Sequence, residues 1–122
     1  MILVDTSVWI GHFRRSDRLL MELLEAGEVL THPFVVGELA CGNLPAPEEV
    51  LGLFQQLPTA PSASDPEALH FIERHRLMGR GIGYVDVHLL ASAALADGAR
   101  VWTADARLAA AASRLFLSYE SH

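Results

Sequence analysis

The sequence predicts an α/β sandwich with a small central parallel sheet flanked by helices, and three observations support this fold class. Short apolar runs without polar alternation occur at residues 2–5, 29–30 and 100–103, as expected of strands buried on both faces. Segments with apolar residues at helical spacing separate these runs, so strands and helices alternate along the chain. Each connection between the runs is long enough to contain a helix, which favours parallel pairing.

In the N-terminal half, the first strand covers residues 2–5, and Ser7 is placed to cap a helix that begins with Val8, Trp9 and Ile10. Prolines suit the first turns of two later helices, and Gly27 and Gly42 suit helix ends. Glu38 would then lie on a short helix that directly follows the second strand. The predicted helices after the first one cover residues 17–26, 33–42 and 47–57.

The C-terminal half begins after a loop at residues 59–64, TAPSAS. An amphipathic helix opens at residue 65, and the glycine-rich connection GRGIG leads to an alanine- and leucine-rich helix at residues 84–97. The last clear strand at residues 100–103 precedes a helix at residues 105–115. The segment FLSY, residues 116–119, is predicted as a terminal edge strand.

Length and composition favour one compact domain, expected to span residues 1–122, because 51% of the 122 residues are hydrophobic. No apolar run approaches the roughly 20 residues needed to cross a bilayer, and no basic leader is visible, so we expect a cytoplasmic protein. The single cysteine, Cys41, excludes an internal disulfide. Its apolar neighbours predict a small buried side chain rather than a nucleophile.

The charge pattern restricts the chemistry further. The formal net charge of −6 has the wrong sign for holding nucleic acid by the overall field, so any such binding is expected to be local or assisted by a metal. The chain contains no lysine. This absence excludes P-loop phosphotransfer, Schiff-base chemistry and other mechanisms that need a catalytic or phosphate-binding lysine.

Four acidic residues follow or adjoin the ends of predicted elements. Asp5 ends the first strand, Asp105 follows the last strand by two residues, Glu38 lies beyond the second strand, and Asp86 lies in the first turn of a helix. Ligand sites of parallel α/β folds gather at the carboxyl ends of the strands. We therefore expect these four side chains at one edge of the sheet.

A purely structural interpretation fits two of the four acids. Asp105 fits an N-cap equally well, and Asp86 would stabilise a helix N-terminus through the helix dipole. Glu38 is harder to explain in this way, because its neighbours are apolar and a buried unpaired carboxylate is costly. Asp5 is harder still, since its strand shows no alternation toward solvent.

Four carboxylates at close range would repel one another unless a positive charge lay between them. With no lysine in the chain and no arginine adjoining Asp5, Glu38 or Asp86 in sequence, a divalent cation is the natural counter-charge. Oxygen ligands favour Mg²⁺ or Mn²⁺ over zinc. His88, two residues from Asp86 on a helix, points away from it and is interpreted as a packing or surface histidine.

Four stretches, MILVDTSVWI, FVVGELACG, GYVDVHLLASA and VWTADARL, resemble the motifs of PIN-domain nucleases, in the same order and over essentially the whole chain. The size and the opening resemble the VapC toxins of bacterial toxin–antitoxin pairs. The resemblance implies a PIN-like three-layer sandwich. It also implies an Mg²⁺- or Mn²⁺-dependent endoribonuclease that uses a metal-activated water and leaves a 5′-phosphate and a 3′-hydroxyl.

By the same resemblance, Asp5, Glu38, Asp86 and Asp105 match the acidic quartet that binds the metal and catalyses cleavage. Ser7 matches the hydroxyl residue that supports the first aspartate, and Thr103 matches the hydroxyl residue before the last one. VapC-like proteins form homodimers and are silenced by an antitoxin protein, for which the apolar surfaces of residues 17–26 and 47–57 are available. Core packing explains those apolar residues equally well.

Arginines are the candidates for contacting RNA. Arg14 and Arg15 follow the first motif and are placed to hold the RNA backbone. The face formed by Arg74, Arg76 and Arg80 serves either the same purpose or only as a solvated helix surface.

The alternative to a nuclease is a catalytically silent PIN fold that binds RNA or protein. A receiver domain is excluded by the missing lysine, and a haloacid-dehalogenase phosphatase by Asp-Thr-Ser at residues 5–7 in place of Asp-x-Asp.

Overall fold

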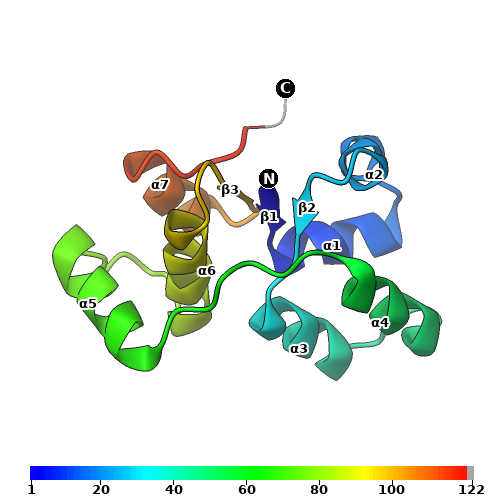
Figure 1. Ribbon diagram of the computed structural model, residues 1–122, viewed down its shortest axis with the longest axis horizontal. Helices are drawn as coiled ribbons and strands as arrows, with labels where there is room; N and C mark the ends of the chain where they lie inside the picture. Colours follow the sequence, from blue (N-terminus) through cyan, green and yellow to red (C-terminus); the bar gives the residue numbers. More distant parts are fainter. Residues whose placement is uncertain (121–122) are drawn as a thin grey trace.

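The computed structural model describes residues 1–120 and has a small parallel sheet at its centre (Figure 1). The sheet has the strand order β2-β1-β3, with β1 at Ile2–Val4, β2 at Val29–Leu30 and β3 at Arg100–Trp102. Leu3 of β1 is paired with Leu30 on one side and with Val101 on the other. The first strand is therefore the central one, and its side chains are buried on both faces of the sheet.

Helices cover both sides of this sheet. Figure 1 shows α5, α6 and α7 in one group and α1 to α4 in another, with the strands between them. The helices are α1 Thr6–Arg14, α2 Arg18–Glu25, α3 Pro33–Cys41, α4 Pro47–Gln56, α5 Asp65–His75, α6 Tyr84–Leu95 and α7 Ala106–Arg114. The predicted α/β sandwich with a small parallel sheet flanked by helices is confirmed.

Helix α6 is the most deeply buried helix and fixes the position of its own first turn. Seven consecutive residues, Val87 to Ala93, are buried. Leu89 and Leu90 are completely buried together with Leu3 of β1 and Leu108 of α7. A helix that is apolar all round belongs inside a protein, and its packing holds the polar residues at its N-terminus in one place.

Two predicted element ends differ from the structure. Helix α1 begins at Thr6 with Asp5 as its N-cap residue, so Ser7 is inside the helix and does not cap it. The Ser7 hydroxyl instead donates a hydrogen bond to the Asp5 carboxylate. The FLSY segment lies beside β3 and forms one parallel bridge, between Ser118 and Val101, rather than a full strand.

The prediction that Cys41 is buried was wrong, because this side chain is exposed at the last turn of α3. The residues of α3 that face the core are Val35 and Leu39. Cys41 does not share their face of the helix, so its apolar sequence neighbours say nothing about its own burial. Within residues 1–120, the helices are too short or too polar for any of them to cross a membrane.

Arginines close the C-terminal end of α5. The Arg80 Nε donates to the carbonyl of Arg76 over 3.0 Å, and Arg114 of α7 donates to the carbonyls of His75 and Arg76. The last carbonyls of a helix have no partner within the helix, and cationic side chains there also complement the helix dipole. Arg80 and Arg114 thus have a structural use that accounts for part of the basic surface near α5.

Candidate functional site

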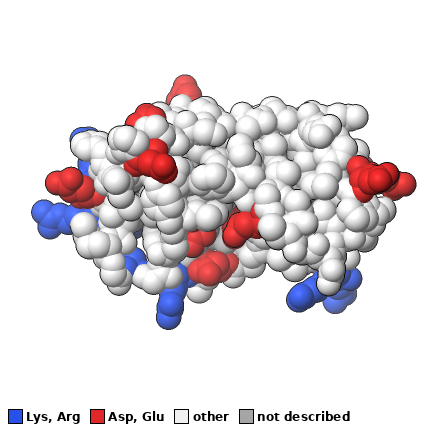
Figure 2. Space-filling model, turned by 90° about the horizontal axis from the view of Figure 1, so that it is seen from below, with Lys and Arg blue, Asp and Glu red and all other residues white. Residues whose placement is uncertain are grey.

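The four predicted acids lie where the strands finish. Asp5 directly follows β1, Glu38 lies on the helix that follows β2, Asp105 is the N-cap of the helix that follows β3, and Asp86 lies in the first turn of α6. Figure 2 views the molecule from this end of the sheet. Acidic side chains gather near the middle of the face, with arginine side chains to either side of them.

Asp5 is buried and receives two hydroxyl groups on one oxygen. Its side chain is 7% exposed, and the hydroxyls of Ser7 and Thr103 each donate to Oδ2 over 2.7 Å. The Asp5 backbone N–H also donates to the carbonyl of Trp102 in β3. Because two hydroxyl donors hold one carboxylate oxygen, the plane of the carboxylate is fixed.

The same hydroxyls connect the first helix to the turn that follows β3. Ser7 Oγ accepts a hydrogen bond from the backbone N–H of Ala104, and Thr103 Oγ1 accepts one from the N–H of Asp105, both over 3.0 Å. Asp105 caps α7, since its Oδ1 accepts from the N–H groups of Arg107 and Leu108. The N-cap interpretation of Asp105 is therefore correct, and it occupies only one of the two carboxylate oxygens.

Glu38 is exposed, which overturns the argument that its apolar neighbours would bury it. Val35 and Leu39 face the core, while Glu38 lies on the flank of α3 that faces α1. There its Oε1 accepts a 2.8 Å hydrogen bond from the hydroxyl of Thr6. Sequence reasoning missed Thr6, although its position directly after Asp5, beside a second hydroxyl residue, was a usable signal.

The four acids share one arrangement: each has one oxygen held by a donor of the protein. For Asp86 this is Oδ2, which accepts from the N–H of Gly83 over 3.1 Å. No hydrogen bond from residues 1–120 reaches the second oxygen, which is Oδ1 of Asp5, Oε2 of Glu38, Oδ1 of Asp86 and Oδ2 of Asp105. Each carboxylate is thus oriented by the fold and keeps one oxygen for another partner.

The charges of the other three acids act on Asp86. Burial raises the pKa of Asp86 above its ordinary value, the hydrogen bond from Gly83 opposes this, and repulsion from Asp5, Asp105 and Glu38 raises the pKa further. No arginine or histidine within residues 1–120 forms an ion pair with any of the four. The site therefore carries uncompensated negative charge.

This donor set fits a hard divalent cation. The free ligands are carboxylate oxygens, and Mg²⁺ prefers oxygen ligands, keeps several waters and commonly uses only one or two carboxylates. Within the described residues, no three His, Cys, Asp or Glu side chains are grouped closely enough to enclose an ion. The acids thus fit a water-rich Mg²⁺ or Mn²⁺ site and do not fit a closed cage such as a structural zinc site.

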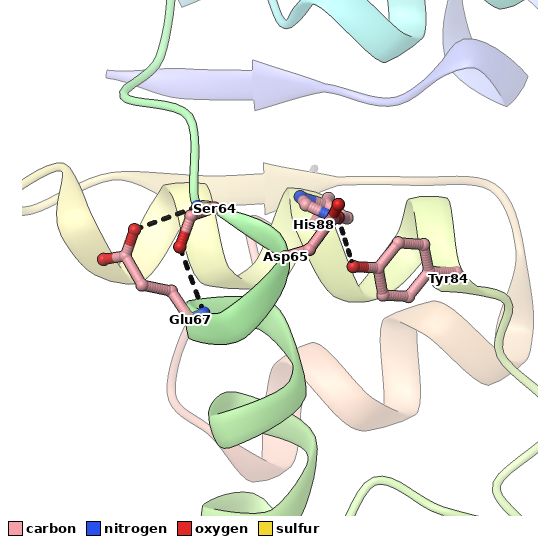
Figure 3. A network of polar contacts seen from close by, with 5 residues as sticks. All are labelled: Ser64, Asp65, Glu67, Tyr84 and His88. Atoms are coloured by element: carbon pink, nitrogen blue, oxygen red, sulfur yellow. Dashed lines mark hydrogen bonds and ion pairs between the residues drawn. The ribbon is translucent and has the colours of Figure 1, made fainter.

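A polar network beside Asp86 joins α5 to the start of α6 (Figure 3). The Tyr84 hydroxyl donates to Asp65 Oδ1 over 2.6 Å, and His88 Nε2 lies 3.6 Å from the same oxygen. The bond to Asp65 raises the pKa of Tyr84. His88 is buried and packs edge-on against the rings of Tyr84 and Phe34, so of its two predicted roles the packing role is correct.

One groove is lined by one of the four acids, Glu38, and by a cation. It has a volume of about 540 Å³ and is lined by Glu38 at the acidic site, by Arg14 and Phe13 of α1, and by Asn43 beyond α3. Arg15 is the C-cap residue of α1, and its backbone N–H bonds to the carbonyl of Gly11. Of the two arginines predicted to contact RNA, Arg14 therefore shares a groove with an acid, and Arg15 does not line it.

Comparison with known proteins places this arrangement in a family. The PIN domain model matches residues 2–114. Ribonuclease VapC32 of Mycobacterium tuberculosis, found in two strains, is 50% identical over 111 residues, which cover 91% of this chain and 90% of the relative.

A solved structure agrees in fold alone. The crystal structure of PAE2754 from Pyrobaculum aerophilum matches with a TM-score of 0.65 at 15% identity, over 97% of this chain and 87% of the other. The identity is too low for that match to carry more than the fold. Because the PIN domain model covers most of the chain and a VapC protein shares half of its residues, the chain belongs to the PIN-domain family and is of the VapC type.

Proposed function

We propose that this protein is a metal-dependent endoribonuclease that acts as the toxin of a toxin–antitoxin pair. The carrying observation is the set of four carboxylates at one end of the sheet, each with one oxygen fixed by the protein and one left free. The 50% identity to a protein named as a ribonuclease supports the reaction class. The proposed metal ligands and catalytic residues are Asp5, Glu38, Asp86 and Asp105.

The proposed role of each residue rests on the geometry of the site. Asp5 presents Oδ1, while Ser7 and Thr103 keep its other oxygen fixed, so this carboxylate does not rotate when substrate enters. Mg²⁺ or Mn²⁺, when bound, would supply an activated water and neutralise charge on the departing oxygen. Glu38 and Asp105 carry their free oxygens on separate helices, on either side of Asp5 in the fold, so the substrate phosphate would lie between them.

The groove beside Glu38 supports a path for the RNA. Arg14 would bind a backbone phosphate there, while the Asn43 amide offers donors and acceptors to a sugar or base. Arg15, next to it on the surface, would add to the local positive field. These local cations would compensate for a net charge that opposes RNA binding.

An apolar groove supports the antitoxin partner. It has a volume of about 450 Å³ and lies between α1, α2 and α4, with Trp9, Phe13, Leu24 and Leu53 among its lining residues. Leu53, which lines this groove, is 62% exposed and would present an apolar side chain to a partner. The antitoxin would cover this surface. A homodimer, which the family resemblance implies, and a cytoplasmic location complete the proposal.

RNA cleavage by the purified protein is the direct test. We expect wild type to cut at least one of transfer, ribosomal or messenger RNA in Mg²⁺ or Mn²⁺ and to stop when EDTA is added. Asp5→Asn and Asp86→Asn should each lower the rate by at least about a hundredfold while the circular dichroism spectrum stays unchanged. Metal-dependent cleavage that survives both substitutions would disprove the proposed site.

The alternative, a catalytically silent binding module, makes a different prediction. Pure wild type would then bind RNA or protein and cleave no RNA with any divalent metal. The toxin role is tested separately by expression in cells, where wild type should arrest growth and Asp5→Asn should not. Active protein that leaves growth unaffected would contradict the toxin role and leave the ribonuclease intact.

A further inference from the structure

Arg107 occupies a position that helix stability does not explain. It is the second residue of α7, and its backbone N–H bonds to Asp105 Oδ1. The first turn of a helix is its positive end, where acidic residues are stabilising and a cation is unfavourable. The first turn of α7 contains no acid. A positive side chain there calls for another use.

The Arg107 side chain is packed against a glycine of the loop that leads to Asp86. A Cβ added at Gly81 would lie 2.7 Å from Cδ of Arg107 and 2.9 Å from its Nη1, so only a glycine permits this approach. Gly81 also has φ +75°, a conformation that favours glycine. The loop of Gly81, which leads to the first turn of α6, thus lies against the Arg107 side chain.

The Arg107 guanidinium has no protein partner among residues 1–120. It makes no hydrogen bond and no ion pair, although Asp105 is two residues away in sequence. Arg80 and Arg114, by contrast, use their guanidinium groups on backbone carbonyls. Arg107 is therefore a cation that the fold holds against the loop that leads to Asp86 and leaves available.

We propose that Arg107 binds an RNA backbone phosphate adjacent to the one that is cut, and that Gly81 exists to allow it. This inference rests on the proposed ribonuclease function. Arg107 would hold the strand on the α6 and α7 side of the acids, while the groove of Arg14 lies on the α1 and α3 side. Arg107 binds substrate and takes no part in the chemical step.

Substitution of Arg107 tests this role by separating KM from kcat. With the RNA that wild type cuts fastest, Arg107→Gln should raise KM by about tenfold and leave kcat and the melting temperature unchanged. The slope of log KM against log salt concentration should fall by about 0.7, the value for one lost phosphate contact on a single strand. Arg107→Lys should restore most of the salt slope, because it keeps the charge.

Gly81 gives a second test that leaves Arg107 intact. Gly81→Ala should displace the Arg107 side chain and raise KM several-fold. Gly79→Ala is the matched control, because Gly79 has a similar φ of +70° and nothing lies within 4 Å of an added Cβ. Both variants carry the same backbone strain, so a KM effect confined to Gly81→Ala would come from the lost position of Arg107.

RNA binding without cleavage separates the failure of this inference from the failure of the proposed function. Fluorescence anisotropy of a labelled single-stranded oligoribonucleotide, with Asp5→Asn protein in Mg²⁺, should show weaker binding when Arg107→Gln is added. If wild type cleaves RNA but Arg107→Gln keeps its KM and its salt slope, the inference is wrong and the ribonuclease stands. A fall in kcat at constant KM would also overturn it. If wild type cleaves no RNA, the proposed function fails first.

Discussion

The Thr103 hydroxyl donates a 2.7 Å hydrogen bond to Asp5 Oδ2 and joins two residues that are 98 positions apart in the chain. Asp5 follows the central strand, and Thr103 follows the strand beside it. Ser7 donates to the same oxygen and lies 3.3 Å from the Thr103 hydroxyl. The three side chains form one unit at the end of the sheet, and the orientation of Asp5 depends on it.

Removal of the Thr103 hydroxyl should therefore weaken both activity and stability. Thr103→Val keeps the side-chain shape but leaves Asp5 Oδ2 with one donor. It also removes the acceptor for the Asp105 N–H. We expect a loss of about 2 kcal/mol in urea unfolding and a fall in kcat of about tenfold, as for a hydrogen bond to a charged group. Thr103→Ser, which keeps the hydroxyl, should stay close to wild type. Equal losses for both variants would contradict a role for the hydroxyl.

The raised pKa of Asp86 predicts a pH effect on the metal-free protein. Between the ordinary aspartate value of 3.8 and the raised value, Asp86 is more protonated in the folded than in the unfolded chain. Its contribution to stability therefore falls as the pH rises through that interval. Asp86→Asn removes this charge and can still accept from the Gly83 N–H. In EDTA at neutral pH, Asp86→Asn should melt at a higher temperature than wild type.

The control for this effect is Glu28→Gln, an exposed acid at the opposite end of β2 from the acidic site. It should leave the melting temperature in EDTA nearly unchanged. The gain from Asp86→Asn should also shrink as the pH is lowered through the raised pKa of Asp86 toward the ordinary value of 3.8, because wild-type Asp86 becomes increasingly protonated over that interval. A gain that is the same at both pH values would mean that charge repulsion is not its cause.

Metal addition should stabilise wild type more than a variant that lacks one of the proposed ligands. A ligand that binds only the folded state at a hundred times its Kd adds about 2.7 kcal/mol of stability. Excess Mg²⁺ should therefore raise the melting temperature of wild type by several degrees. It should raise the melting temperature of Asp5→Asn far less. Isothermal titration with Mg²⁺ gives the same comparison without heating, and equal affinities would remove Asp5 from the set of metal ligands.

The positions of the strands and the starts of several helices could be predicted, because short stretches of sequence determine them. The apolar residues before Asp5 predict a buried strand, and an acid directly after such a strand is placed at the end of the sheet whatever the rest of the chain does. The starts of α3 at Pro33 and of α4 at Pro47 could be predicted for the same reason. Position along the chain was thus enough to place Asp5, Asp86 and Asp105 at the ends of elements, whereas Glu38 lies inside α3.

Contacts between residues far apart in the sequence could not be predicted from local sequence patterns. The bond from Thr6 to Glu38 spans 32 positions, and the position of Thr6 after Asp5 does not indicate which distant residue it contacts. The burial of Glu38 and Cys41 was misjudged because sequence neighbours on a helix point to different faces. Ser7 was predicted to cap α1 because a hydroxyl before an apolar run usually caps. Here the Ser7 hydroxyl donates to the Asp5 carboxylate instead, on the oxygen that also accepts from Thr103.

The arginines near the end of α5 should contribute to stability and not to RNA binding. Arg114→Gln removes a cationic donor from the carbonyls of His75 and Arg76, so urea unfolding should show a loss of about 1 kcal/mol. KM for RNA should stay unchanged, in contrast to Arg107→Gln. Arg18→Gln is the matched control, because the Arg18 side chain is 93% exposed and its one ion pair within residues 1–120 is with Glu22 on its own helix. It should alter neither quantity, whereas a KM increase for Arg114→Gln would assign this basic surface to the RNA.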